Sequence, residues 1–314
     1  MNYQRKIQDL SHKIEEALLP LIDSDYVLWE CPYYSNIGDI LIWEGELQFL
    51  KKTKHICLDM ASASTCRFPK LSSDVIILLQ GGGNFGDLWR TAQEFRLRVC
   101  QTYPDNRIIL FPQTVFYMDS EQMRADARLM SVHPRLTICV RDQASYRLVS
   151  KNFGNTVLLV PDMAFCLSLQ ELKTFSGREE PRGLFLKRLD KEDGMVSFSL
   201  PKNLPFEVSD WPTIEKKIWH QRLLNGLLKL DRRFPFFGYF ADRWALLVFR
   251  RRLIQIGVRF ASRYHVIYTT RLHMLILSVL LEKKCFVIDN LYGKNSSFYQ
   301  TWLRDCEGIE SIES

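Results

Sequence analysis

The stretch HVIYTTRLHMLILSVLLEKKCFVIDN, residues 265–290, decides the fold class of this chain. It predicts a short apolar strand at 265–269, a tight turn, an apolar helix at 272–281 and a second strand at 285–289. A strand, a helix and a strand of these lengths make the βαβ unit from which parallel sheets are built. The stretch therefore predicts an α/β fold.

Two side chains, Arg271 and His273, lie where this predicted strand gives way to the helix. In open α/β sheets, ligands bind outside the carboxyl ends of the strands. A helix N-terminus at such an edge attracts anions through its unpaired N–H groups and its dipole. A guanidinium and an imidazole there predict an anion-binding site with a proton donor. The alternative is that Arg271 is a surface cation and His273 a half-buried histidine with a structural hydrogen bond.

Similar junctions recur in the first half of the chain. Apolar runs that lead into polar turns predict five strands, at 26–31, 74–80, 107–111, 137–141 and 156–160. Arg141 ends one of these strands, and Asp142 is expected to cap the helix that follows it. Asp39 is expected to cap the helix after the first strand. Five strand–turn–helix units in 165 residues predict a doubly wound N-terminal domain.

Three consecutive glycines, residues 81–83, follow the predicted strand at 74–80 and precede Asn84. Glycine lowers the stability of regular structure, so such a run makes sense where a ligand or another backbone segment must approach closely. We expect a ligand-facing loop here, with a purely structural turn as the alternative. The loop is not a Walker motif, because no GK[ST] follows, and it lacks the GxGxxG spacing of dinucleotide-binding sites.

The chain has 314 residues, of which 46% are hydrophobic and 25% charged, and this indicates a globular protein with two domains of ordinary size. A polar segment with Gly and Pro at 171–182 is the predicted linker. It separates an N-terminal α/β domain at 1–170 from a C-terminal α/β domain at 183–295. The last segment, 296–314, is predicted to contain a helix that could fold back across the domain boundary.

The N-terminal residues carry charges every few positions, which is typical of neither a signal peptide nor a membrane span. Their apolar residues recur at helical spacing and predict an amphipathic packing helix with Ile7, Leu10, Ile14 and Leu18 on its buried face. The eight cysteines lack CxxC spacing and several lie in apolar runs, so we expect small buried side chains in a reducing cytoplasm. No cluster of ligands predicts a metal site.

Basic residues are concentrated between positions 216 and 263, where twelve Lys and Arg stand against two Asp in a chain of net charge +6. The rest of the chain is therefore slightly acidic. The run FPFFGYFADRWALLVFRRRLIQIGVRF, residues 234–260, interleaves these cations with aromatic side chains. Such a pattern suits an anionic membrane surface or a nucleic acid. The alternative is that the aromatics belong to the core and the arginines to its solvated rim.

Seven motifs together resemble one known family, the polysaccharide pyruvyl transferases. In chain order they are NIGD at 36–39, QGGGNFGD at 80–87, PQT at 112–114, VRDQAS at 140–145, VPDMAF at 160–165, LKRLDKED at 186–193 and TTRLHMLILSV at 269–279. The resemblance implies two Rossmann-like domains in the glycosyltransferase B architecture, with the active site in the cleft between them. The segment from 196 to 262 matches none of the family's motifs.

The resemblance also implies a reaction. The family uses phosphoenolpyruvate as donor, bridges two hydroxyls of a sugar as a pyruvate ketal and releases phosphate. Phosphoenolpyruvate is then a co-substrate and no cofactor is expected, because arginines and helix N-termini can bind the leaving phosphate. Arginine pairs with carboxylate and phosphate, and histidine is the usual proton donor. The expected acceptor is a sugar of a polysaccharide or of its lipid-linked precursor, at the cytoplasmic face of the membrane.

Site residues follow from the resemblance and from the junctions described above. The predicted catalytic residues are His273, Arg271 and Asp39. Donor binding is assigned to cations and to the glycine loop, namely Arg141, Arg271, Arg188, Lys187, Gly82, Gly83, Asn84 and Lys294. Asn295 is expected to close over the donor together with Lys294. Acceptor binding is assigned to Asn36, Asp39 and Asp87, with helix capping as the alternative for the two aspartates.

Two other functions fit the same architecture. A nucleotide-sugar-dependent glycosyltransferase would need a ribose-binding carboxylate, for which Glu282, at the far end of its helix, is the clearest candidate. A non-catalytic relative would serve as a scaffold in a polysaccharide assembly complex. A nucleic-acid partner is not expected, because no nucleic-acid-binding module is recognisable.

Overall fold

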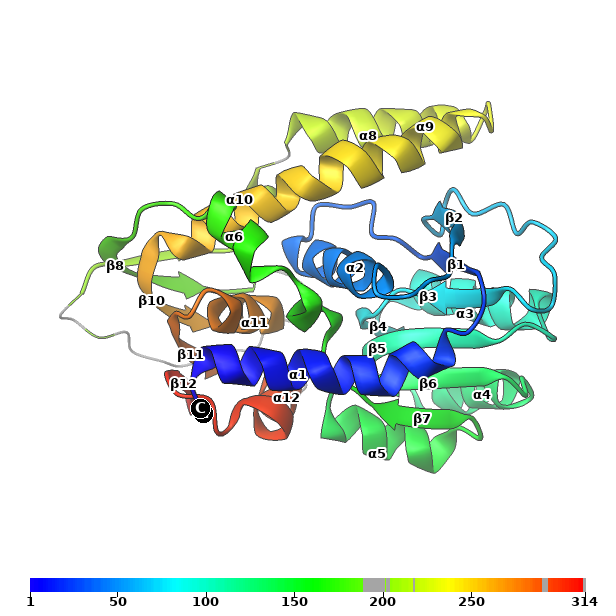
Figure 1. Ribbon diagram of the computed structural model, residues 1–314, viewed down its shortest axis with the longest axis horizontal. Helices are drawn as coiled ribbons and strands as arrows, with labels where there is room; N and C mark the ends of the chain where they lie inside the picture. Colours follow the sequence, from blue (N-terminus) through cyan, green and yellow to red (C-terminus); the bar gives the residue numbers. More distant parts are fainter. Residues whose placement is uncertain (189–200, 202–203, 217, 290–292, 313–314) are drawn as a thin grey trace.

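The computed structural model describes residues 1–188, 201, 204–216, 218–289 and 293–312. These residues form two β-sheets with helices packed on their faces (Figure 1). Every strand pairing in both sheets is parallel. The predicted α/β class is confirmed, and two parallel sheets fit the expected pair of Rossmann-like units.

The first sheet has the strand order β2-β1-β3-β5-β6-β7, with β4 beside β5. Its strands are β1 Tyr26–Trp29, β2 Cys57–Ala61, β3 Ile76–Leu79, β4 Gly82–Gly86, β5 Ile108–Phe116, β6 Leu136–Val140 and β7 Thr156–Leu159. The helices of this part are α1 Tyr3–Leu18, α2 Ile37–Leu50, α3 Arg90–Thr102, α4 Ser120–Ser131 and α5 Gln143–Asn152. All five predicted strands are present. Strand β5 is longer than expected, because it continues through the PQT motif.

The second sheet has the order β12-β11-β10-β8-β9. Its strands are β8 Glu180–Leu186, β9 Phe206–Ser209, β10 Tyr264–Thr269, β11 Lys284–Ile288 and β12 Ile309–Ile312. Its helices are α6 Leu169–Phe175, α7 Pro212–Glu215, α8 Trp219–Asp231, α9 Phe237–Trp244, α10 Arg250–Ser262, α11 Leu272–Leu280 and α12 Lys294–Phe298. Strand β10, helix α11 and strand β11 form the βαβ unit predicted from residues 265–290, and the two strands are parallel.

Three expectations about local structure need correction. The helix α2 is capped by Asn36, whose side chain accepts a hydrogen bond from the backbone of Gly38, so Asp39 lies inside the first turn and is not the N-cap. The segment expected as a linker, residues 171–182, contains most of α6 and the start of β8. Residues 82–86 form strand β4 where a loop was expected. Strands β2, β9 and β12 were not predicted at all.

Helix α2 lies between the two sheets and joins their cores (Figure 1). A helix that is apolar on all sides must be buried on all sides, and eleven of the residues of α2 are buried. It packs against α10 and α11 from the second half and against the turn Met163–Cys166 from the first. One continuous apolar cluster therefore extends from the first sheet through α2 to the second sheet.

Helix α1 has the predicted amphipathic form. Its buried face contains Ile7, Leu10, Ile14 and Leu18, as expected from their spacing, and it packs against α11 and the turn Met163–Cys166. The eight cysteines are all unpaired; six are buried and two, Cys57 and Cys166, are partly buried. Among the described helices, none combines the length and the apolar character needed to cross a bilayer.

The last part of the chain contacts both halves. The helical segment α12, continued by Tyr299–Leu303, packs against α5 of the first sheet. Ser297 accepts a hydrogen bond from the backbone of Ala144, and the indole of Trp302 donates to the carbonyl of Arg141 at 2.7 Å. The chain then returns to the second sheet as β12, beside β11. The turn after β6 is thus held by residues more than 150 positions away.

Candidate active site

A cavity of about 870 Å³ opens where strands of both sheets end. Nine of the residues predicted from the sequence line it: Asn36, Asp39, Gly83, Asn84, Arg141, Arg188, Arg271, His273 and Lys294. They follow β1, β3, β6, β8, β10 and β11 along the chain. Parallel strands bring their carboxyl ends to one edge of a sheet, which is how residues far apart in sequence come to share this cavity.

Arg141 and His273 meet at a buried carboxylate, Asp162. The Arg141 Nη1 donates to Asp162 Oδ2 at 2.6 Å, and the His273 Nε2 lies 3.5 Å from the same oxygen. The His273 Nε2 is also 3.3 Å from Arg141 Nη1. Arg141 and Asp162 are fully buried, whereas the His273 side chain keeps 11% of its surface exposed. A histidine from the second sheet thus shares one carboxylate with an arginine from the first.

The Asp162 carboxyl stays ionised in spite of its burial. Burial by itself raises the pKa of this group, but the hydrogen bond from His273 and the charges of Arg141 and His273 outweigh it. The pKa of Asp162 is therefore lowered below its usual range. Its other oxygen accepts a hydrogen bond from the backbone N–H of Ala164 at 2.9 Å. The site therefore keeps a fixed negative charge beside the imidazole.

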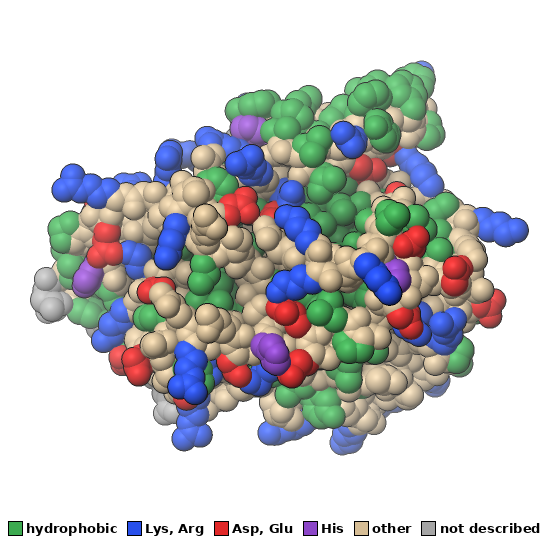
Figure 2. Space-filling model, viewed as in Figure 1, with side chains coloured by type: hydrophobic (Ala, Val, Ile, Leu, Met, Phe, Trp, Pro, Cys, Tyr) green, Lys and Arg blue, Asp and Glu red, His purple; other side chains and the backbone are tan. Residues whose placement is uncertain are grey.

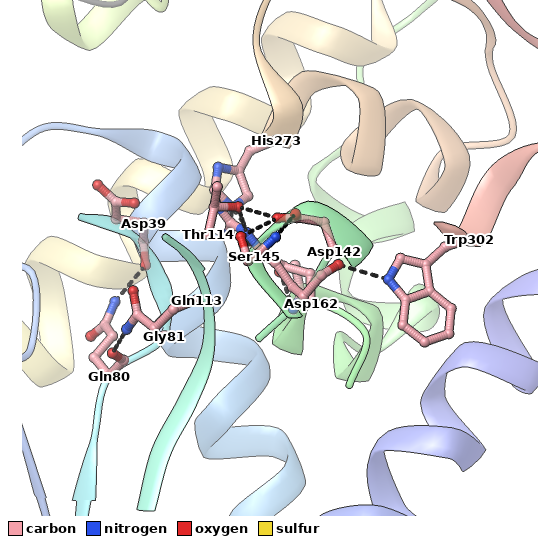
Figure 3. A network of polar contacts seen from close by, with 12 residues as sticks. Asp39, Gln80, Gly81, Gln113, Thr114, Asp142, Ser145, Asp162, His273 and Trp302 are labelled. Carbon is pink, nitrogen blue, oxygen red and sulfur yellow. Dashed lines mark hydrogen bonds and ion pairs between the residues drawn. The ribbon is translucent and has the colours of Figure 1, made fainter. Parts of the chain in front are cut away.

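The position of Arg141 is fixed from its other side by the PQT motif. Its Nε donates to the hydroxyl of Thr114 at 2.9 Å, and that hydroxyl donates to Asp142 at 2.9 Å. Asp142 is the N-cap of α5, as predicted, and also accepts from Ser145 (Figure 3). This chain of hydrogen bonds holds the guanidinium in one orientation toward the cavity.

Arg271 is paired in a different way. It is the N-cap residue of α11, and its Nε and Nη2 donate to the two oxygens of Asp210 in a fork-to-fork arrangement. Both side chains are buried. Asp210 also accepts from the backbone of Trp211, which lines the cavity, at 2.7 Å. A bidentate pair fixes the plane of the guanidinium as well as its place.

The NIGD motif supplies one wall of the cavity. A Cβ atom at Gly38 would lie only 2.4 Å from Nδ1 of His273, so this position must be glycine for the imidazole to sit here. The side-chain amide of Asn36 donates to Asp39 at 2.8 Å. The carboxylate of Asp39, which lines the cavity, is therefore oriented by the residue that caps its helix.

The glycine-rich strand β4 supplies another part of the wall. A Cβ atom at Gly83 would come within 3.0 Å of Arg141 Nη2 and 3.5 Å of Lys294 Nζ, so the bare backbone makes room for two cations. Asn84 is fixed by Arg96, which donates hydrogen bonds to its backbone carbonyl and to its side-chain oxygen. Arg96 is in turn paired with Glu30 at 2.7 Å. The predicted ligand-facing role of this stretch fits this placement.

Arg188 and Lys294 are two further cations of the cavity, which Arg90 also lines. Both side chains are more than nine-tenths buried and line the cavity. Arg188 follows β8 and its backbone donates to the hydroxyl of Thr270 at 2.9 Å. Asn295 does not line the cavity, because its side-chain amide donates to the carbonyls of Thr270 and Ile288. It ties the turn after β10 to the end of β11 and so positions its neighbour Lys294.

Besides Asn295, three predicted residues lie outside the cavity lining. Lys187 directly follows β8, and its backbone donates to Ser209 in the neighbouring strand. Gly82 lies in β4 with φ of +145° but does not reach the cavity surface. Asp87 accepts hydrogen bonds from the backbone N–H groups of Met118 and Asp119, the closest at 2.7 Å. These contacts tie the turn after β4 to the segment before α4, and they differ from the helix cap that was the alternative for Asp87, since the N-cap of α3 is Trp89. The LKRLDKED motif lies outside the described residues from position 189 on.

Three important polar residues were not predicted as site residues: Asp162, Asp210 and Arg96. The first stands in the VPDMAF motif directly after β7, the same kind of position as Arg141, so its placement could have been inferred. Asp210 follows β9, which the apolar pattern did not reveal. Arg96 lies within α3 and is recognisable only from its contacts. Among the described residues, no group of three or more His, Cys, Asp or Glu is arranged to hold a metal ion.

The arrangement can bind a small anion beside a proton donor. Five cations and a histidine line one cavity. Three of the cations, Arg90, Arg141 and Arg271, pair with buried carboxylates that fix them in place. Arginine and lysine complement carboxylate and phosphate groups, and a histidine nearby can give or accept a proton. On the wall formed by α2, Asp39 offers a carboxylate to a hydroxyl group.

Comparison with known proteins identifies relatives of this chain. The family model described as polysaccharide pyruvyl transferase matches residues 36–292. A Bacillus subtilis (strain 168) protein named "Putative pyruvyl transferase EpsO" is 32% identical, over 99% of this chain and 95% of that protein. "Pyruvyl transferase 1" of Schizosaccharomyces pombe is 28% identical, over 90% of this chain and 71% of the yeast protein.

A solved structure has the same overall fold. The crystal structure of the functionally uncharacterized protein KP1_0663 from Klebsiella pneumoniae aligns with a TM-score of 0.68, over 98% of this chain and 99% of that one. The sequence identity is 18%, so this likeness concerns the fold alone. It covers both sheets of the chain described here.

Proposed function

Because the chain belongs to the polysaccharide pyruvyl transferase family, we propose that it transfers the enolpyruvyl part of phosphoenolpyruvate to a sugar. Two hydroxyls of the sugar become bridged as a pyruvate ketal, and phosphate is released. The observation that carries this proposal is the shared contact of His273 and Arg141 with Asp162, inside a cavity lined by four more cations. Phosphoenolpyruvate is a compact anion, so its use requires clustered cations and a side chain that can give a proton.

Donor binding falls to the cations of the cavity. Phosphoenolpyruvate carries a carboxylate and a phosphate on three carbons, so it needs several cations within a short span. Arg141 and Lys294 approach each other across Gly83, and Arg271 and Arg188 come from the second sheet. We assign Arg141 and Arg271 to the two anionic groups, with Arg188 and Lys294 beside them.

Proton transfer falls to His273. Protonation of the methylene carbon makes the neighbouring carbon electrophilic, and a first sugar hydroxyl then bonds to it. The C–O bond to phosphate breaks, phosphate leaves, and the second hydroxyl closes the ketal ring. One hydroxyl proton replaces the proton given to the methylene carbon, and the other leaves with phosphate or solvent. Asp162 positions the imidazole, and Asp39 is placed to accept a hydroxyl proton.

The same proposal includes the glycosyltransferase B architecture with its cleft between two domains. What supports it is that residues of both sheets line one cavity and that two of them, Arg141 and His273, touch. If the halves move on binding, the Arg141–His273 contact should change. Small-angle X-ray scattering with and without phosphoenolpyruvate tests this, and an unchanged profile would speak against closure.

The test of the activity is an assay of phosphate release. The protein is incubated with phosphoenolpyruvate and acceptors that contain galactose, mannose or N-acetylhexosamine. The expected result is acceptor-dependent phosphate release together with a product whose mass has grown by one pyruvate less one water. Release without acceptor would indicate hydrolysis only. Transfer of sugar from a nucleotide-sugar, with no use of phosphoenolpyruvate, would support the glycosyltransferase alternative.

A further inference from the structure

A helical hairpin projects from one edge of the molecule (Figure 1). It consists of α8, α9, the π-helical turn Ala245–Phe249 and the start of α10, with α8 packed against α9. Eight of the seventeen large hydrophobic side chains that are exposed among the described residues lie in this hairpin: Trp219, Leu223, Leu230, Phe234, Phe236, Tyr239, Phe240 and Leu247. This concentration forms an apolar surface, which we call the hairpin face.

The hairpin face is continuous. Phe236 and Phe237 stack with their ring centroids 4.3 Å apart, and Phe240 touches both rings. Beside them lies an apolar groove of about 470 Å³, whose lining includes Trp244 and Leu247. Figure 2 shows hydrophobic side chains gathered over this end of the molecule. Contiguous exposed apolar surface of this kind marks a place where a protein meets another surface.

The charges around the hairpin face have one sign. Arg222, Lys229, Arg232, Arg233 and Arg243 are all exposed. The two acids of the segment are turned inward. Asp231 pairs with Arg67 at 2.5 Å, and Asp242 accepts hydrogen bonds from the hydroxyls of Tyr33 and Thr65. Burial raises the pKa of Asp242 to about 6, in keeping with its inward position.

The combination of exposed apolar side chains and surrounding cations favours one kind of partner. Exposed aromatic and aliphatic side chains inside a group of cations suit the interface of a membrane with anionic lipids, where apolar side chains insert and cations bind headgroups. A second copy of the chain would bring two positive faces together, and their repulsion would oppose that contact at low salt. We propose that the hairpin face binds the surface of an anionic membrane.

The hairpin also borders the cavity. Gln221 and Asn225 on α8 line it, and Gln221 donates to the carbonyl of Tyr33 and to Asn225. The same helix presents Trp219 and Leu223 to solvent. Binding through the hairpin face would hold the cavity close to the lipid surface. If the proposed function is right, a lipid-linked sugar would then reach Asp39 without leaving the membrane.

Arg250 does not belong to the hairpin face, although its neighbours in the RRR run, Arg251 and Arg252, are exposed. Its guanidinium pairs with Glu44 of α2 and lies over the ring of Trp43. Burial lowers the pKa of Arg250 to about 10. Substitution of the whole run, which the sequence alone suggests as a test, would therefore disrupt the contact between the two halves. The variants must use other residues.

The test is flotation of the full chain with vesicles of phosphatidylcholine alone or mixed with phosphatidylglycerol. The fraction that floats is expected to rise with phosphatidylglycerol and to fall by at least tenfold between low and high salt. The variant Phe236→Ser/Tyr239→Ser/Phe240→Ser and the variant Arg232→Glu/Arg233→Glu/Arg243→Glu should each float no more than protein without vesicles. A matched control, Met118→Ser/Leu129→Ser/Val132→Ser, removes exposed hydrophobic residues elsewhere and should float like the wild type.

The outcomes separate the explanations. Absence of flotation at low salt on vesicles rich in phosphatidylglycerol overturns the proposal. The proposal is also overturned if light scattering shows a concentration-dependent dimer that the serine variant abolishes. In that case a second copy of the chain would cover the hairpin face. Thermal unfolding of each variant confirms that it is folded. Flotation does not depend on catalysis, so failure here leaves the proposed transferase activity untouched, and the reverse also holds.

Discussion

Arg141 and Arg271 occupy equivalent places in the two sheets, yet their carboxylate partners differ in what else they touch. Each arginine follows a parallel strand, lies at the start of a helix and pairs with a buried aspartate. Asp162 contacts both Arg141 and His273, whereas Asp210 forms a bidentate pair with Arg271. The comparison suggests a division of work. The first pair adjoins His273, the proposed proton donor, and the second holds a rigid cation for the proposed anionic substrate.

The largest effect is expected from His273→Ala. If the imidazole is the proton donor of the first pair, phosphate release should fall by about 100- to 10,000-fold. The fold should survive, because the side chain is partly exposed at the cavity wall. Steady-state kinetics and thermal unfolding measure the two quantities. A folded and fully active variant would remove the histidine from the mechanism.

The two aspartates offer the sharpest contrast. Asp162→Asn and Asp210→Asn should both lower the free energy of unfolding, by about 3–5 kcal/mol each, since each leaves a buried guanidinium without its carboxylate. Only Asp162→Asn should also change the pH profile of kcat, because only Asp162 contacts His273. Asp210→Asn should raise the KM for phosphoenolpyruvate and leave the pH profile of kcat unchanged. Identical pH profiles in both variants would show that the comparison is mistaken.

Substitution of either arginine by lysine tests whether the guanidinium group, and not only its charge, is needed. Arg141→Lys and Arg271→Lys keep the charge but lose the forked geometry. Loss of one charge-assisted hydrogen bond is worth about 1.5–3 kcal/mol, so kcat/KM for phosphoenolpyruvate should fall about 10- to 100-fold. Lys187→Arg is a matched control outside the cavity lining. Wild-type kinetics in both lysine variants would place the donor elsewhere.

The smallest effect is expected on the acceptor side. Asp39→Asn keeps the hydrogen-bonding shape of the side chain but removes the base. Because the hydrogen bond to the hydroxyl is kept, kcat should fall only about tenfold, less than the full contribution of a general base. Asp87→Asn serves as its control, because that carboxylate caps backbone N–H groups away from the cavity. Kinetics at saturating donor and varied acceptor measure both. Equal losses in the two variants would argue that Asp39 acts only through the structure of its turn.

Much of the fold was predictable because it depends on local patterns. The strand–helix–strand unit at 265–290 has apolar runs that no loop would tolerate, and the five strands of the first sheet are marked in the same way. That Arg141, Arg271 and His273 line one cavity was predictable, because the carboxyl ends of parallel strands converge. The cap of α2 was assigned three residues too late, because Asn36 and Asp39 are both good cap formers.

What could not be predicted depends on contacts between distant parts of the chain. Strand β4 is rich in glycine and has no apolar pattern, so its pairing with β5 is visible only in the structure. Asp210 owes its importance to Arg271, which is 61 positions away. The basic–aromatic run divides in a way that helical spacing alone did not resolve: Phe249 and Phe260 join the core, whereas Phe236 and Phe240 face solvent.

The central claim, that the cavity shared by the two sheets binds phosphoenolpyruvate, is tested most directly by calorimetric titration of the protein without acceptor. Wild-type protein is predicted to bind phosphoenolpyruvate with one site per chain, and Arg141→Lys and Arg271→Lys are predicted to weaken that binding about 10- to 100-fold. A nucleotide-sugar should give no binding. The account would be contradicted if the nucleotide-sugar bound and phosphoenolpyruvate did not, or if phosphoenolpyruvate bound equally well to all three proteins.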